Sequence, residues 1–224
     1  YENRNPATNS ALRTCYSADN EPFLAKKDNK RLLQEKFGLP VRSDVTVIGY
    51  VGRLIVNQKG IDMLHRMLWR EQFRNCQFVI MGHGEEAWEE RFTTLSAFLP
   101  ESVAISTKYD DVTASIIYAG SDFVLIPSHF EPCCLIQMNA MRYGAIPIAR
   151  ATGGLSDTIV DGRNGILYVE STSSALREAI KRALELKKRS LKRHHTMVRE
   201  AMKTDFSWIS SAKKYIDLYR KMID

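Results

Sequence analysis

What the sequence lacks already limits what the protein can be. No apolar run approaches the roughly 18 residues that a membrane-spanning helix needs, so we expect no membrane partner. The start of the chain is polar and contains no apolar segment of the kind found in a signal peptide. The first residue is tyrosine rather than methionine, and we therefore expect a piece of a longer protein.

Cysteine is scarce, and its spacing excludes the common zinc and redox motifs. The four cysteines, Cys15, Cys76, Cys133 and Cys134, form no CxxC pair. We therefore expect neither a metal site nor a disulfide framework. The adjacent pair at 133–134 is read as small buried residues, because neighbouring cysteines rarely bridge. The lack of a disulfide framework is typical of a protein in a reducing compartment, and we expect the cytoplasm, or the plastid stroma if the source is a plant or an alga.

The charge is unbalanced but not extreme. The net charge is +6, with 44% hydrophobic and 26% charged residues, as in ordinary globular proteins. Much of the positive excess lies between residues 177 and 203. A nucleic-acid patch is one interpretation of this run. A solvated helix face is the more common one, and the run has no interleaved aromatic residues for base stacking, so we expect no nucleic-acid partner.

Short apolar strands alternate with helical patterns along the chain. This alternation predicts an α/β fold, a Rossmann-like doubly wound domain with a parallel sheet covered on both faces, over residues 25–205. Residues 1–24 are predicted to be a polar connector, and residues 206–224 a C-terminal helix. The expected strands lie at 45–51, 77–81, 103–106, 122–126, 145–149 and 165–169. The expected helices lie at 30–39, 61–69, 85–98, 110–119, 133–143, 157–160, 173–186, 190–203 and 208–222.

In such a sheet the functional residues are expected in the loops that follow the strands. The loop at 52–60 carries Arg53 and Lys59 after a buried strand. Two cations at a strand end can neutralise a diphosphate without a metal. Two solvated surface cations would give the same pattern. The loop Gly82-His83-Gly84 lacks the third glycine of GxGxxG, so it predicts a tight turn and no nicotinamide cofactor.

The segment 127–155 holds two more loops of this kind. Pro132 suits the first position of a helix, which would aim the following amides at an anion beside Glu131. A capping box made by Ser128 and Glu131 is the alternative. The amides so predicted to bind belong to Cys133, Cys134 and Leu135. The turn at 152–155 is predicted to form a second anion cradle, with a plain glycine turn as the alternative.

Four segments resemble the glycogen and starch synthases that use nucleoside-diphosphate glucose. NPATN at 5–9 resembles the stretch that links the two halves of those enzymes. GRLIVNQKGID at 52–62 resembles their RLxxQKG loop. Residues 126–159 resemble their PSxFEPCGLxQ…MxYGxxPxxxxTGGLxDT segment, and DFSWISSAKKYIDLY at 205–219 resembles their C-terminal FSW segment.

The resemblance implies the C-terminal, nucleotide-sugar-binding half of a two-domain GT-B enzyme. It implies transfer of glucose, with retention, from ADP-glucose or UDP-glucose to an α-1,4-glucan, without metal or other cofactor. The N-terminal half with its KxGGL motif is absent from this sequence. We therefore expect residues 1–24 to lead from that half, residues 206–224 to pack towards it, and the isolated chain to bind nucleotide weakly without turnover.

Carried over by position, the resemblance also implies roles for single residues. Arg53 and Lys59 would bind the diphosphate and stabilise the leaving group, and Glu131 would hold the donor glucose. Tyr109 would pack near the adenine. The rest of the donor site would be lined by Gly52, Cys133, Cys134, Leu135, Thr152, Gly153, Gly154 and Leu155.

The sequence departs from the family pattern in three places. The loop from Arg53 to Lys59 is one residue longer than in most bacterial and plant members. Cys134 replaces a glycine, and Asn139 replaces the second acid of an E-x7-E pattern. Two rival functions follow, namely a retaining GT-B glycosyltransferase with another acceptor and an inactive glucan- or nucleotide-binding regulatory module.

Overall fold

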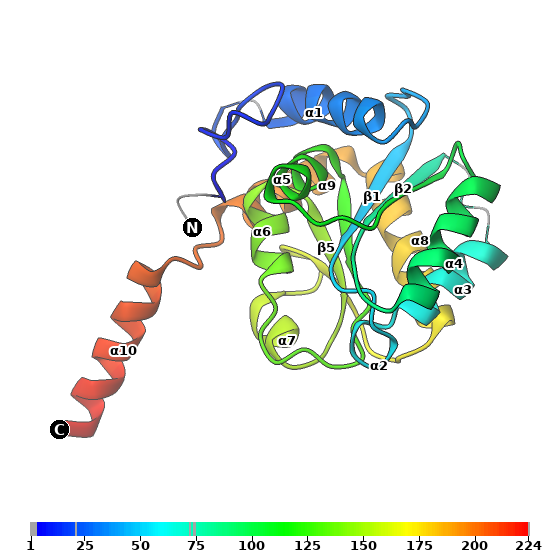
Figure 1. Cartoon of the computed structure of the whole chain (residues 1–224). Coiled ribbons are helices and arrows are strands. Elements are labelled where there is room, and N and C mark those ends of the chain that lie inside the picture. Colours follow the sequence, from blue (N-terminus) through cyan, green and yellow to red (C-terminus); the bar gives the residue numbers. More distant parts are fainter. Residues whose placement is uncertain (1–3, 21, 72, 74, 224) are drawn as a thin grey trace.

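Six parallel strands form one sheet in the order β3-β2-β1-β4-β5-β6 (Figure 1). The structure is a computed structural model that describes residues 4–20, 22–71, 73 and 75–223. The predicted Rossmann-like doubly wound α/β domain is confirmed. The strands are β1 (Thr46–Val51), β2 (Cys76–Met81), β3 (Val103–Ser106), β4 (Phe123–Ile126), β5 (Ile146–Arg150) and β6 (Ile166–Tyr168).

The strand order places a crevice between β1 and β4. The chain runs outward from β1 through β2 to β3, then crosses back to β4 on the other side of β1. At such a switch point, the loops that leave the two strands diverge, and ligands of open α/β sheets bind there. The loops concerned are 52–60 and 127–135, which the sequence had singled out.

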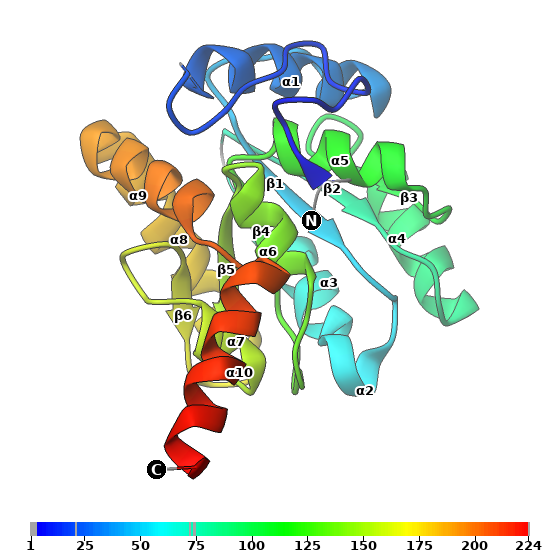
Figure 2. The ribbon, with the colours of Figure 1, turned by 90° about the vertical axis from the view of Figure 1, so that its left-hand side faces the viewer.

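Helices cover both faces of the sheet (Figures 1 and 2). On one face α5 and α6 pack against the sheet, with α1 outside α5, and on the other lie α3, α4 and α8. Helix α9 packs against α6, α8 and β5. The helices are α1 (Pro22–Lys36), α2 (Val56–Lys59), α3 (Ile61–Arg70), α4 (Glu86–Phe98), α5 (Asp111–Gly120), α6 (Ile136–Arg142), α7 (Gly154–Thr158), α8 (Ser173–Arg189), α9 (Leu191–Lys203) and α10 (Trp208–Ile223).

Helix α1 differs most from its prediction. It begins at Pro22 rather than at residue 30, inside the predicted connector, and ends at Lys36. Its buried positions follow helical spacing but are largely polar, so an apolar pattern could not reveal its first half. Two shorter elements also differ: one turn of helix, α2, lies in the predicted loop at 52–60, and α7 begins three residues before the predicted helix at 157–160.

The described part of the predicted connector packs on the domain. Leu12 and Tyr16 are buried in the core. The Tyr16 hydroxyl donates to the Tyr143 carbonyl at 2.7 Å, and the Asn9 amide donates to the Tyr143 hydroxyl at 2.8 Å. The segment is therefore an edge of this domain, and its role as a link to a second domain stays a prediction.

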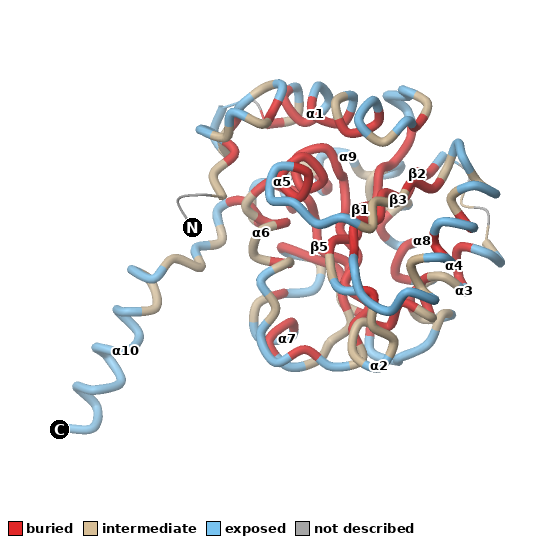
Figure 3. The backbone as a smooth tube through the Cα atoms, viewed as in Figure 1, coloured by how far each residue is buried: buried red, intermediate tan, exposed pale blue. Residues whose placement is uncertain are grey.

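Helix α10 stands away from the body (Figure 3). None of its described residues is buried. Several large apolar side chains are exposed along it, including Trp208, Ile209, Tyr215 and Tyr219. Its predicted packing on another domain stays a prediction. Within the described ranges, no helix is long and apolar enough to cross a membrane.

Candidate functional site

The loops after β1 and β4 are locked together at the switch point. The His129 amide donates to the Gln58 carbonyl at 2.8 Å. Gly60 has a φ of +62°, and a Cβ there would lie 2.2 Å from the Pro127 carbonyl oxygen. Because only glycine allows both this conformation and this approach, the two loops act as one rigid unit.

Lys59 and Glu131 meet at the centre of this unit. The Lys59 Nζ lies 2.5 Å from the Glu131 Oε2, and the Ser128 hydroxyl donates to the same oxygen at 3.1 Å. Only 6% of the Glu131 side chain and 16% of the Lys59 side chain are exposed. The structure thus joins two of the predicted site residues in a charge-assisted contact.

Arg53 lies on the same loop but faces solvent. Its guanidinium donates to the Gln58 Oε1 at 2.6 Å, and its carbonyl accepts from the Tyr50 hydroxyl at 2.8 Å. Tyr50 is buried, and burial, followed by the charges of Cys134 and Glu131, raises the pKa of its phenol. Sequence reasoning missed both Tyr50 and Gln58, although Gln58 belongs to the QKG motif. These contacts hold the backbone of the loop and leave the Arg53 side chain accessible.

The segment 131–136 corrects two predictions. Helix α6 begins at Ile136, because Cys134 has a φ of +64° and a left-handed residue cannot belong to a right-handed helix. Pro132 is therefore not the first residue of a helix, and the amides of 133–135 lie in an irregular loop. The capping box is also wrong, since Ser128 and Glu131 bond to each other side chain to side chain before any helix begins. Leu135 is exposed.

Cys134 is half-buried beneath this loop. Burial raises the pKa of its thiol above the ordinary range, while the backbone amides of Ile136 and Gln137 lower it in part. Cys133 next to it is exposed. The position at which the resembling family has glycine is thus one whose backbone favours glycine.

The turn at 152–155 packs against the backbone of the loop that carries Glu131. Gly153 has a φ of +47°, and a Cβ there would lie 2.1 Å from the Glu131 carbonyl oxygen. The Gly154 amide donates to that same carbonyl at 3.0 Å, and the Leu155 amide donates to the Thr152 carbonyl at 3.1 Å. Two amides of the predicted cradle are therefore already used inside the chain. The contacts of this turn hold the backbone of Glu131 in place.

Tyr109 lies before α5, beyond the end of β3. Its hydroxyl donates to Asp111 at 2.8 Å. Arg4 forms an ion pair with the Asp111 carboxylate and reaches the Tyr109 hydroxyl at 3.4 Å. Burial, together with the hydrogen bond to Asp111, raises the pKa of Tyr109. Arg4 carries no motif in the sequence and was missed.

The site is an open wall rather than an enclosed pocket. The hollow between the two loops measures about 20 Å³, close to the size that holds a single water. It is lined by Tyr50, Gly52, Lys59, Ser128 and Cys134, among others. Within the described residues no cluster of three His, Cys, Asp or Glu side chains could hold a metal ion.

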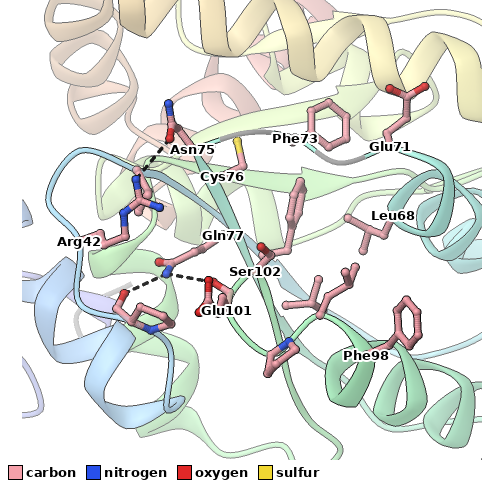
Figure 4. A pocket seen from close by; sticks show the side chains of 16 residues that line it. Arg42, Leu68, Glu71, Phe73, Asn75, Cys76, Gln77, Phe98, Glu101 and Ser102 are labelled. Atoms are coloured by element: carbon pink, nitrogen blue, oxygen red, sulfur yellow. Dashed lines mark hydrogen bonds between the residues drawn. The ribbon is translucent and has the colours of Figure 1, made fainter.

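A larger cavity of about 470 Å³ lies at the opposite, amino ends of β2 and β3 (Figure 4). Its polar groups are engaged with one another. The Gln77 side-chain amide donates to the carbonyls of Pro40 and Glu101 at 2.9 and 3.3 Å, and Arg42 donates to Asn75 at 3.3 Å. None of the residues predicted for the site lines this cavity.

Comparison with known proteins shows which family the chain belongs to. The family described as "Glycosyl transferases group 1" matches residues 33–204. The chain is 42% identical over 227 residues to a glycogen synthase of Thermosipho melanesiensis, covering 99% of this chain and 47% of that protein. It is 41% identical to a glycogen synthase of Syntrophotalea carbinolica, covering 98% of this chain and 46% of that protein.

Among solved structures, the catalytic domain of starch synthase IV from Arabidopsis thaliana, bound to ADP and acarbose, is similar to this chain. The TM-score is 0.89 and the identity 33%, over 98% of this chain and 47% of the other. The chain thus spans a little under half the length of the relatives it matches.

Proposed function

The chain belongs to the group 1 glycosyl transferases, and we propose that it is the donor-binding, C-terminal half of a GT-B glycogen or starch synthase. The proposed reaction moves glucose from ADP-glucose, with UDP-glucose as a variant, to the non-reducing end of an α-1,4-glucan with retention. The glucan hydroxyl forms the new bond to the anomeric carbon, the bond to the diphosphate breaks, and the hydroxyl proton leaves with the nucleoside diphosphate.

The observation that carries the proposal is the contact of Lys59 with Glu131 at the switch point. Arg53 and Lys59 on one loop supply two positive charges where the leaving diphosphate develops negative charge, and fixed cations of this kind stabilise such a transition state. Glu131 is held by Lys59 and Ser128, and it would accept hydrogen bonds from the donor glucose. Tyr109, in the loop between β3 and α5, would pack near the base.

ADP-glucose is favoured over UDP-glucose by the similarity to a starch synthase bound to ADP, at 33% identity over 98% of this chain. The glycogen synthases at about 40% identity favour a glucan acceptor over the other acceptors that GT-B enzymes use. Assays of the longer protein with both donors, and with glycogen as acceptor, would decide these two choices.

The open wall and the exposed α10 favour a two-domain cleft. We propose that a second domain supplies the other wall, that residues 5–9 lead from it, and that the apolar face of α10 packs on it. The chain alone would then bind nucleotide without transferring glucose. An upstream reading frame that encodes KxGGL would support this arrangement, whereas its absence would favour a binding module.

The test is the affinity of the chain for ADP, measured by calorimetry. A charge-assisted contact contributes about 1.5–3 kcal/mol, so Arg53→Ala and Lys59→Ala should each weaken ADP binding by about 10- to 100-fold. Lys181→Ala, which removes an exposed lysine of α8, should leave the affinity unchanged. Equal affinities for all four proteins would refute the assignment of the site.

A further inference from the structure

A second group of charged side chains lies at the amino end of β4, the end away from the donor loops. It surrounds a cavity of about 110 Å³ between α1, α8 and α9. Of the described residues that line it, one carries a carboxylate and most of the other polar ones are basic. The basic ones are Lys26, Lys27, Lys30, Lys187, His194 and His195.

The single carboxylate, Asp122, is already paired with two of these lysines. Its Oδ2 lies 2.7 Å from the Lys30 ammonium and 2.6 Å from the Lys187 ammonium, and it accepts the Val47 amide at 2.9 Å. Two lysines thus share one negative charge. Burial opposes ionisation of Asp122, but the charges of Lys30 and Lys187 outweigh it and hold its pKa well below the ordinary range.

Lys26 has no acid partner among the described residues. It is buried, and its ammonium donates to the carbonyls of Ala119 and Tyr143 at 3.0 and 3.1 Å. An ammonium has three donors, and these two bonds leave one for a ligand. Burial, the largest cause, together with the nearby charges of Lys30 and Lys187, lowers the pKa of Lys26 to about 7, although Asp122 acts in the opposite direction.

His194 is the unpaired polar side chain of the cavity. It is only 5% exposed, and neither ring nitrogen has a hydrogen-bond partner. A neutral imidazole offers one donor and one acceptor, and leaving them unmade in a buried place costs free energy. At the mouth, the His195 ring stacks on Phe23 with ring centres 3.6 Å apart. Lys27 is exposed beside it.

We propose that this cavity is a binding site for a phosphoryl group, either free phosphate or a phosphomonoester. Positive charge exceeds negative charge among the described lining residues, so a bound dianion would balance it. On the same measure the cavity is more than five times the hollow at Lys59, which is close to the size of a single water, so it has room for a tetrahedral oxyanion. Hydrogen phosphate also carries both acceptors and an O–H donor, which matches an ammonium N–H and a neutral imidazole.

The site is independent of the donor site. The cavity shares no lining residue with the hollow at Lys59 and Glu131. The strands that separate the two ends of the sheet rise about 3.3 Å per residue, which puts the ends about 20 Å apart along the six residues of β1. The bound phosphate would join α1 to α8 and α9, and we expect it to stabilise the fold.

The experiment is a calorimetric titration of inorganic phosphate into the chain with ADP present at saturation, so that the donor site is filled. We expect one saturable site. Lys26→Met and His194→Leu should each weaken it by about tenfold or more, while Lys188→Met, at an exposed neighbour on α8, should leave it within twofold. The thermal midpoint should rise with phosphate in the wild type and not in the first two variants.

A parallel titration with methyl phosphate identifies the source of the phosphoryl group. Binding equal to that of inorganic phosphate assigns the site to phosphomonoesters, and binding of inorganic phosphate alone assigns it to the free ion. The proposal is overturned if the wild type shows no saturable site in the millimolar range, or if both cavity variants bind as well as Lys188→Met. Either result leaves the ADP affinities, and the proposed function, untouched.

Discussion

Strand β4 has a buried carboxylate at each of its ends, and the two differ in what holds them. Asp122, just before the strand, accepts hydrogen bonds from two lysines and a backbone amide that come from α1, α8 and β1. Glu131, five residues after the strand, is held by Lys59 and Ser128, both of which lie on the loops of the site. Asp122 is therefore held by helices and a strand of the domain, and Glu131 only by residues of the two loops at the candidate site.

The difference indicates how the same chemistry serves stability at one end and binding at the other. A buried charge that is fully paired by separate elements stabilises their relative placement, and removal of its charge leaves its partners uncompensated. A buried charge paired only by loop residues at an open crevice can exchange part of that pairing for a ligand.

Asp122→Asn should have the largest effect on stability. The asparagine keeps the shape but leaves the buried ammonium of Lys30 and the half-buried one of Lys187 without a counter-charge, and breaking a buried pair in this way costs about 3–5 kcal/mol. Urea unfolding would measure the loss. Asp44→Asn is the matched control, because Asp44 pairs with Arg42 on an exposed surface, and it should change stability little. If both variants unfold at the same urea concentration, Asp122 does not stabilise the packing of α1, α8 and β1.

Glu131→Gln should act on binding more than on folding. Its carboxylate is proposed to hold the donor glucose, so the variant should bind ADP-glucose about 10- to 100-fold more weakly, the equivalent of 1.5–3 kcal/mol, and ADP almost as well as the wild type. Lys59→Gln should weaken both ligands, because it contacts the diphosphate. Calorimetry with the two nucleotides gives the comparison. A variant that loses ADP and ADP-glucose equally would place Glu131 at the phosphates instead.

His194 makes the amino end of the sheet sensitive to pH. Burial, the largest cause, together with the charges of Lys187, His195 and Lys26, lowers its pKa to about 4, although Asp122 acts in the opposite direction. Between that value and the 6.5 of an exposed histidine, the unfolded chain binds a proton that the folded chain does not. Stability should therefore rise with pH over this window, by up to about 1.4 kcal/mol per unit.

His194→Leu should remove this slope in urea titrations at pH 4 to 6.5, done in phosphate-free buffer so that the proposed anion is absent. His83→Leu, at an exposed histidine in the turn between β2 and α4, is the control and should keep the slope. An unchanged slope in His194→Leu would assign the pH dependence to other groups.

The strands could be predicted because their buried residues are apolar. Only the second half of α1 could be predicted in this way. Within α1 the helical spacing is occupied by Lys26, Asn29, Lys30, Leu33 and Gln34, all buried and all but one polar. Lys26 donates to the carbonyls of Ala119 and Tyr143, and Lys30 pairs with Asp122, so their partners lie more than 90 residues further along the chain. A local sequence pattern cannot show that a buried polar side chain will find a hydrogen-bond partner elsewhere in the fold.

The site was predictable in the same limited way. The loops after β1 and β4 place Lys59 against Glu131, because the carboxyl ends of parallel strands share an edge, while the binding roles of Arg53, Lys59 and Glu131 stay a prediction. The direct contact of Lys59 with Glu131, the use of the Gly154 amide inside the chain and the late start of α6 depend on backbone angles. Those angles follow from contacts between loops and not from local sequence.

Cys134→Gly should stabilise the chain by about 1 kcal/mol, because a non-glycine residue in the left-handed region costs about 1–2 kcal/mol and part of that gain is lost with the thiol. Asn75, the other described non-glycine residue with positive φ, has a φ of 60°. Asparagine tolerates this conformation, so Asn75→Gly should gain less. Urea midpoints of the two variants would check the order. A larger gain at position 75 would show that Cys134 is not strained.

Removal of residues 207–224 should have the smallest effect on this chain, although it deletes more apolar surface than any of the other changes. No described residue of α10 is buried, so its loss should change the free energy of unfolding by no more than about 0.5 kcal/mol. Leu33→Ala in α1 removes a fully buried side chain and should cost about 2–5 kcal/mol. Urea unfolding compares the two. A cost above about 1 kcal/mol for the truncation would mean that α10 packs on this domain in solution, and its apolar face would then not be free for the proposed second domain.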